Sequence, residues 1–273
     1  MIDDIKSYLE DKPSHQKINF LREYLQSIIL KIICDTGFKN KITFTGGTAL
    51  RIIYKINRFS EDIDFSLTEK EGYNFNKLID TVSSNLIKYA FNFEIKRIKT
   101  DIINSFFIRF SNLLSELDLS LQKSQKLSIK VEIDSNPPIG GKIEEYIYFE
   151  RFYFVINHYA PESLFALKLH AILFRRYQKG RDYYDLVYFL NKNIIPDIKL
   201  LNNAMHQTEK IDKTFTLKDI ILKLENKIDI LNEKKIIDDI RPFILKEDEL
   251  NLLAKKNILL FIKQYRNNIG IKE

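Results

Sequence analysis

The sequence predicts an α+β protein, in which a mixed sheet with flanking helices is followed by an all-helical C-terminal domain. Two observations support this prediction. Up to about residue 158, segments in which apolar and polar residues alternate, as in strands, are interspersed with helical patterns. After Tyr159 the alternation stops, and apolar residues recur at helical spacing to about residue 267. We therefore expect two domains, residues 1–158 and residues 159–273.

The first predicted elements are a helix, a strand and a second helix. Residues 17–36 have apolar residues at helical spacing, and Gly37 is well suited to end that helix. Residues 42–45 predict a short strand, which leads through two glycines into the helical segment TALRIIYKI. The stretch RFSEDIDFSL, residues 58–67, then predicts a strand with Asp62 and Asp64 on one face and apolar residues on the other.

The middle of the chain contains most of the predicted strands. A helix is expected over residues 74–90, and strands over residues 91–99, 104–113 and 146–156. Residues 127–134, LSIKVEID, alternate strictly, which places Glu132 and Asp134 on the polar face of their strand. Two prolines and two glycines within residues 137–141 predict the clearest loop in the chain.

The C-terminal part predicts helices only. Residues 160–178 form one helical pattern with Pro161 near its start, where proline is tolerated. Residues 180–193, GRDYYDLVYFLNKN, form a second pattern after a glycine break. Helical periodicity continues over residues 197–267.

Composition limits the classes of function. The 273 residues include 43 basic and 37 acidic side chains, a net charge of +6 that favours anionic partners. A single cysteine, Cys34, excludes an internal disulfide and suits a reducing cytosol, so we expect a cytoplasmic protein. The N-terminus lacks the apolar segment of a signal peptide, and no apolar run approaches the ~20 residues that span a bilayer.

Asp62 and Asp64 are the strongest candidates for chemistry. Their Cα atoms lie about 6.5 Å apart on one strand face, given a rise of ~3.3 Å per residue. Carboxylates at this distance repel each other unless a cation lies between them. Magnesium prefers oxygen ligands and usually keeps bonds to substrate phosphates. The pair therefore predicts a Mg²⁺ site, with Glu132 as the best third carboxylate and Asp134 as the reserve choice.

The segment TGGT, residues 45–48, predicts a phosphate-binding turn. Gly46 and Gly47 stand between a strand and a helix, where glycine permits close approach of a phosphate. A helix start offers unpaired N–H groups to an anion, and the Thr48 hydroxyl would add a donor.

Two ordered blocks of residues carry a family resemblance. GGTALRIIYKINRFSEDIDF resembles the signature of the DNA polymerase β-type nucleotidyltransferases, and GGTAL with RFSEDIDF is similar more closely to the AbiEii/AbiGii toxins, including the MenT type. LFALKLHAILFRRYQKGRDYYDLVYFL, further along the chain, resembles the downstream block of the same toxins. The resemblance covers residues 44–190 and implies a polymerase β-like fold followed by a helical domain.

The resemblance also implies an activity and partners. It implies transfer of a nucleoside monophosphate from a nucleoside triphosphate, with release of pyrophosphate, to the 3′ end of tRNA. A cognate antitoxin protein is the implied partner. Two alternatives stay open at this point: transfer to a hydroxyl of a protein or small molecule, and a non-catalytic nucleotide-binding module.

Roles for single residues follow from the matched motifs. Gly46, Gly47 and Thr48 would hold the triphosphate, while Asp62, Asp64 and Glu132 would bind magnesium, and Glu132 would help to deprotonate the attacking hydroxyl. Lys168 would face the triphosphate; Asp182 would either orient Lys168 or lie beside the nucleotide. Arg181 and Asp185 complete the RDxxDL match. For Arg58 we weigh contact with a phosphate against bracing of its loop, and for Ser60 nucleotide binding against closing a turn.

Overall fold

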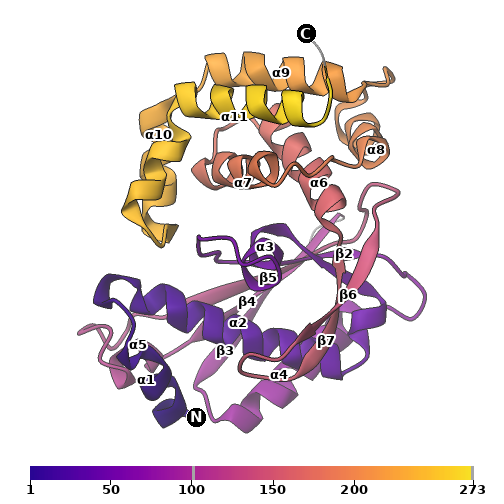
Figure 1. Ribbon diagram of the computed structural model, residues 1–273. Helices are drawn as coiled ribbons and strands as arrows, with labels where there is room; N and C mark the ends of the chain where they lie inside the picture. The colour runs from indigo at the N-terminus through magenta and orange to yellow at the C-terminus, as the bar shows by residue number, and fades with distance from the viewer. Residues whose placement is uncertain (100–101, 272–273) are drawn as a thin grey trace. The chain divides into compact units, whose positions relative to one another are not determined.

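The computed structural model describes residues 1–99 and 102–271 (Figure 1). The chain forms two compact units, and each is described by itself. The units consist of Met1–Lys55, Phe59–Pro137 and Ile143–His158 for the first, and of Ile56–Arg58, Pro138–Lys142 and Tyr159–Glu273 for the second. Residues 56–58 and 138–142, which we had assigned to the N-terminal domain, thus belong to the second unit. A domain boundary at residue 158 stays our proposal.

A mixed seven-stranded sheet is the centre of the first unit. Its strands are β1 (Ile42–Thr45), β2 (Ile63–Leu67), β3 (Phe93–Lys99), β4 (Ile103–Phe110), β5 (Leu127–Asp134), β6 (Ile143–Tyr148) and β7 (Phe154–Tyr159). They lie in the order β3-β4-β5-β2-β1-β7-β6. β2 is antiparallel to β1 and parallel to β5, so it lies between them near the middle of the sheet. The expected α+β fold with a mixed sheet is confirmed.

The apolar faces of the strands pack against helices. The helices of this unit are α1 (Ile2–Glu10), α2 (Lys17–Asp35), α3 (Gly46–Ile52), α4 (Phe75–Leu86) and α5 (Leu113–Glu116). In β5, Ile129, Val131 and Ile133 are fully buried, as their alternation predicted. α2 packs on α4 and β5 and contributes buried Leu25 and Ile28 to the same core.

The second unit contains the C-terminal helices. They are α6 (Pro161–Phe174), α7 (Gly180–Asn191), α8 (Ile198–Glu209), α9 (Leu217–Asp229), α10 (Glu233–Ile240) and α11 (Lys255–Asn268). α6 packs on α7 and α8, and α11 packs on α7 and α9. Gly180 allows α7 and α10 to approach closely, because a Cβ there would lie 1.9 Å from the carbonyl oxygen of Ile236. The expected helical C-terminal region is confirmed.

Several predicted boundaries differ from the structure. The single strand expected over residues 146–156 is two strands, β6 and β7, separated by a turn at residues 149–153. The two glycines, which we expected between the strand and the helix, are the first two residues of α3. Among the described residues, no helix is long and apolar enough to cross a membrane.

Candidate active site

The β1–β2–β5 region brings the predicted acidic residues together. Asp64 pairs in register with Thr45 of β1 on one side and with Glu132 of β5 on the other. Side chains of residues paired in register project from the same face, and neighbouring strands lie about 4.8 Å apart. Glu132 is thus the direct neighbour of Asp64, whereas Asp134 pairs with Ser66, further along the strand. The register favours Glu132 over Asp134 as the third carboxylate.

Gly46 lies directly against the Asp64 carboxylate. Its φ angle is +74°, a conformation that residues with a Cβ rarely adopt. A Cβ added at this position would lie 2.1 Å from Oδ2 of Asp64 and 2.8 Å from its Cγ. The predicted phosphate-binding turn and the predicted metal ligand are therefore in contact through the bare backbone of Gly46.

Thr48 connects the same two elements. It is fully buried, and its hydroxyl donates a hydrogen bond to the carbonyl oxygen of Asp62. This bond ties α3 to the segment that enters β2. The structure thus shows a positioning contact for the Thr48 hydroxyl, where we had expected a donor to phosphate. Gly47 follows Gly46 in the first turn of α3, as the motif requires.

Lys168 and the RDxxDL block form an ion-pair cluster within the second unit. Nζ of Lys168, on α6, lies 2.8 Å from Oδ1 of Asp182 and 2.8 Å from Oδ2 of Asp185, both on α7. Burial disfavours the charged form of Lys168, but the carboxylates of Asp182 and Asp185 favour it more strongly, so the pKa of Lys168 is raised. Burial also opposes the charge of Asp182, but Lys168 and Arg175 outweigh it and lower the pKa of this carboxyl. The contact agrees with Asp182 orienting Lys168, and this role stays a prediction, as does a place for Asp182 beside the nucleotide.

Arg58 is part of this cluster. Its Nε and Nη2 atoms each lie 2.6 Å from an oxygen of Asp185, a two-pronged pair in which both side chains are almost completely buried. Asp185 therefore binds Arg58 and Lys168 at once. This geometry agrees with Arg58 bracing its loop. Contact of Arg58 with a nucleotide stays a prediction.

The comparisons with known proteins agree with these motifs. A family model described as "Nucleotidyl transferase AbiEii toxin, Type IV TA system" matches residues 28–255, most of the chain. The chain belongs to the AbiEii family. It is thus a nucleotidyltransferase of a toxin–antitoxin family, and the enzyme interpretation is favoured over a non-catalytic binding module. No curated protein matches the chain.

Solved structures share the fold of this AbiEii-family chain. The structure of JHP933 from Helicobacter pylori is 20% identical with a TM-score of 0.53, and the match covers 92% of this chain and 95% of JHP933. A candidate nucleotidyltransferase from H. pylori is 20% identical with a TM-score of 0.54, and the match covers 91% of this chain and 96% of that one. At this identity the likeness shows the fold alone.

The acidic residues of the AbiEii-family chain fit a hard cation by their chemistry, because carboxylate oxygens are the ligands that such a cation prefers. Asp64 and Glu132 offer carboxylate oxygens from adjacent strands, and Asp62 precedes β2 by one residue. Lys130 forms an ion pair with Glu132. Desolvation lowers the pKa of Lys130, but the negative charges of Glu132, Asp62 and Asp64 outweigh this effect, and the pKa is raised. The carboxylates thus already attract the positive charge of Lys130. No three His, Cys, Asp or Glu side chains within residues 1–99 and 102–271 gather closely enough to hold a metal ion.

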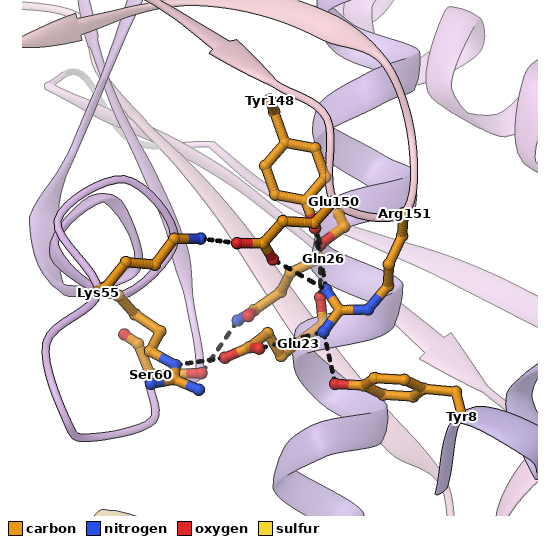
Figure 2. Close-up of polar contacts among 10 residues, drawn as sticks. Tyr8, Glu23, Gln26, Lys55, Ser60, Tyr148, Glu150 and Arg151 are labelled. Carbon is orange, nitrogen blue, oxygen red and sulfur yellow. Dashed lines mark hydrogen bonds and ion pairs between the residues drawn. The ribbon is translucent and has the colours of Figure 1, made fainter.

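Gln26 supports this site, although its position in the sequence was not singled out as functional. Gln26 of α2 is buried, and its Nε2 atom donates to the carbonyl oxygens of Ser60 at 3.1 Å and Glu61 at 2.9 Å (Figure 2). It fixes the backbone just ahead of Asp62, and Ser60 contributes its carbonyl oxygen to this contact. The available signal was a glutamine on the buried face of an apolar helix, where an amide needs partners.

Proposed function

We propose that this AbiEii-family protein is a magnesium-dependent toxin that transfers a nucleoside monophosphate from a nucleoside triphosphate to the 3′ end of tRNA in the cytoplasm. The contact between Gly46 and the Asp64 carboxylate is the main support for this proposal. It unites a backbone surface suited to phosphate with a carboxylate suited to magnesium. The net charge of +6 favours RNA as the acceptor. The MenT-type resemblance of RFSEDIDF agrees with a tRNA substrate.

Different residues of the chain would serve different parts of this reaction. Asp62, Asp64 and Glu132 would hold Mg²⁺, which supplies neutralisation of phosphate charge when bound. The backbone of Gly46 and Gly47 would receive the triphosphate, and release of Lys130 from Glu132 would free that carboxylate. Within the second unit Lys168 pairs with Asp182, and contact of Lys168 with the triphosphate stays what the family resemblance implies.

The transfer step is a displacement at phosphorus. The 3′ hydroxyl oxygen of the acceptor forms a bond to the α-phosphorus, and the bond from that phosphorus to the bridging oxygen of the β-phosphate breaks. Pyrophosphate leaves with the electron pair of the broken bond. Glu132 is the base that takes the hydroxyl proton, because it is the carboxylate next to Asp64 on the neighbouring strand.

Labelling of total RNA tests the acceptor directly. Purified protein is incubated with magnesium and each of the four α-labelled nucleoside triphosphates, and the products are treated with RNase or protease. We expect label in tRNA that RNase removes. Asp64→Asn should abolish it, whereas Asp80→Asn, an exposed acid of the same unit, should not. Label that survives RNase but not protease, or label in small molecules only, would redirect the proposal to a different acceptor hydroxyl.

A further inference from the structure

The first unit contains a polar pocket, with a volume of about 200 Å³, whose lining includes none of the candidate active-site residues. Its wall includes side chains from α1, α2, the C-terminal part of α3 and the turn between β6 and β7 (Figure 2). Four of these side chains are basic and two are acidic, which leaves an excess of two positive charges. They are Lys12, Arg51, Lys55 and Arg151, with Glu23 and Glu150. We call it the Arg151 pocket.

Arg151 is held in place before any ligand binds. Its guanidinium donates to the hydroxyl of Tyr148 at 2.9 Å and to the hydroxyl of Tyr8 at 2.6 Å. Glu23 lies 3.5 Å from Arg151 and 2.5 Å from Arg51, so one carboxylate fixes two arginines. Such preorganisation lowers the entropic cost of binding a ligand.

Two further groups in the wall, the Lys12 ammonium and the Tyr8 hydroxyl, are able to bind an anion. Nζ of Lys12 lies 5.2 Å from the ring centre of Tyr8 and 5.3 Å from that of Phe20. Within the described chain its contacts are to these rings, and it forms no ion pair there. Burial raises the pKa of Tyr8 to about 12, so its hydroxyl keeps its proton at neutral pH. Since that oxygen accepts from Arg151, its proton is available to a ligand.

Size and charge together define the ligand. The volume is below the ~300–1,000 Å³ typical of pockets for drug-sized molecules, so the pocket suits a small group or one small part of a larger ligand. The planar guanidinium fork of arginine matches phosphate oxygens, and lysine adds a point charge. We propose that the Arg151 pocket binds a phosphate group. The excess positive charge and the fixed arginine favour this ligand over a neutral or cationic one.

The pocket is connected to the candidate active site through two elements. Arg51 lies on α3, the helix that begins at Gly46. Glu23 lies on α2 one turn before Gln26, which holds the carbonyl oxygens of Ser60 and Glu61. A phosphate bound here would thus rest on the same helices that position Gly46 and Asp62. The phosphate group has two possible sources. One is a phosphodiester of the acceptor RNA, which rests on the proposed function, and the other is free phosphate.

The test measures binding of inorganic phosphate by NMR titration of the full chain. The variants are Lys12→Gln and Arg151→Lys, the second of which keeps the charge but removes the fork. Lys6→Gln is the matched control, because it removes the same charge from an exposed position of the same N-terminal segment. We expect Lys12→Gln to weaken binding about tenfold, the loss expected for one charge-assisted hydrogen bond, and Lys6→Gln to leave it unchanged. A folded-state spectrum of each variant precedes the titration.

A short RNA added to the phosphate complex separates the two sources. Displacement of phosphate by RNA assigns the pocket to a phosphodiester, and phosphate binding without displacement assigns it to a free anion. Absence of saturable phosphate binding, or equal weakening by Lys6→Gln, overturns the inference. Asp64→Asn should bind phosphate like the wild type. Phosphate binding without any nucleotide transfer would therefore refute the proposed function and leave the pocket standing.

Discussion

Replacing Gly46 by alanine tests the contact on which the candidate active site depends. The added Cβ would lie 2.1 Å from Oδ2 of Asp64, whereas real Cβ atoms essentially never approach a neighbour below 3.0 Å. The carboxylate must therefore retreat by about 0.9 Å. A displacement of about 1 Å in a catalytic group costs ~10²-fold in rate, so we expect a loss of this order in nucleotide transfer.

The same substitution also strains the backbone. Alanine at a φ angle of +74° costs roughly 1–2 kcal/mol in the free energy of unfolding. Gly37→Ala is the matched control, because its φ angle is +82° but nothing lies within 4 Å of the added Cβ. Denaturant unfolding should show a similar backbone cost in the free energy of unfolding of both variants. The transfer assay should show a large loss of activity for Gly46→Ala alone. Full activity in Gly46→Ala, or equal losses in both variants, would refute the reasoning.

Three further predictions concern the second unit. Gly180→Ala should lower the thermal stability of this unit, because the added Cβ would lie 1.9 Å from the carbonyl oxygen of Ile236. An unchanged melting curve would show that α7 and α10 are not in this close contact. Asp185→Asn should cost about 3–5 kcal/mol in denaturant unfolding, since it removes one charged partner from the buried ion pair with Arg58. Asp80→Asn, at an exposed ion pair, should cost under about 1 kcal/mol. The lowered pKa of Asp182 stabilises the folded state above the ordinary value of 3.8, and this contribution is lost as pH falls through the lower folded pKa. Acid titration of unfolding should show this loss, and Asp182→Asn should remove it; an identical acid profile in both proteins would contradict the assigned cause.

Much of the fold could be predicted because local patterns determine it. The strict alternation of residues 127–134 matches β5, since one face of that strand packs in the core and the other does not. The turn between β6 and β7 was missed, because the predicted strand ran through residues 149–153 without a break. The helical C-terminal region followed from periodicity, but the bounds of α8 to α11 depend on packing partners far apart in sequence.

The candidate site was only partly predictable from the sequence. Motif spacing identified Gly46 and Asp64, but their contact depends on the pairing of β1 with β2. The sequence already placed Glu132 ahead of Asp134, and the register of β5 against β2, which no local pattern contains, supports that order. The buried pair of Arg58 with Asp185 joins residues far apart in the chain, so sequence reasoning left two roles open for Arg58.

The most direct measurement of the central claim is a crystal structure of the protein with magnesium and a non-hydrolysable nucleoside triphosphate. We predict metal density between the carboxylates of Asp62, Asp64 and Glu132, with the triphosphate over the backbone of Gly46 and Gly47. Lys130 should have released Glu132. A triphosphate bound elsewhere, or metal bound without these carboxylates, would contradict the account.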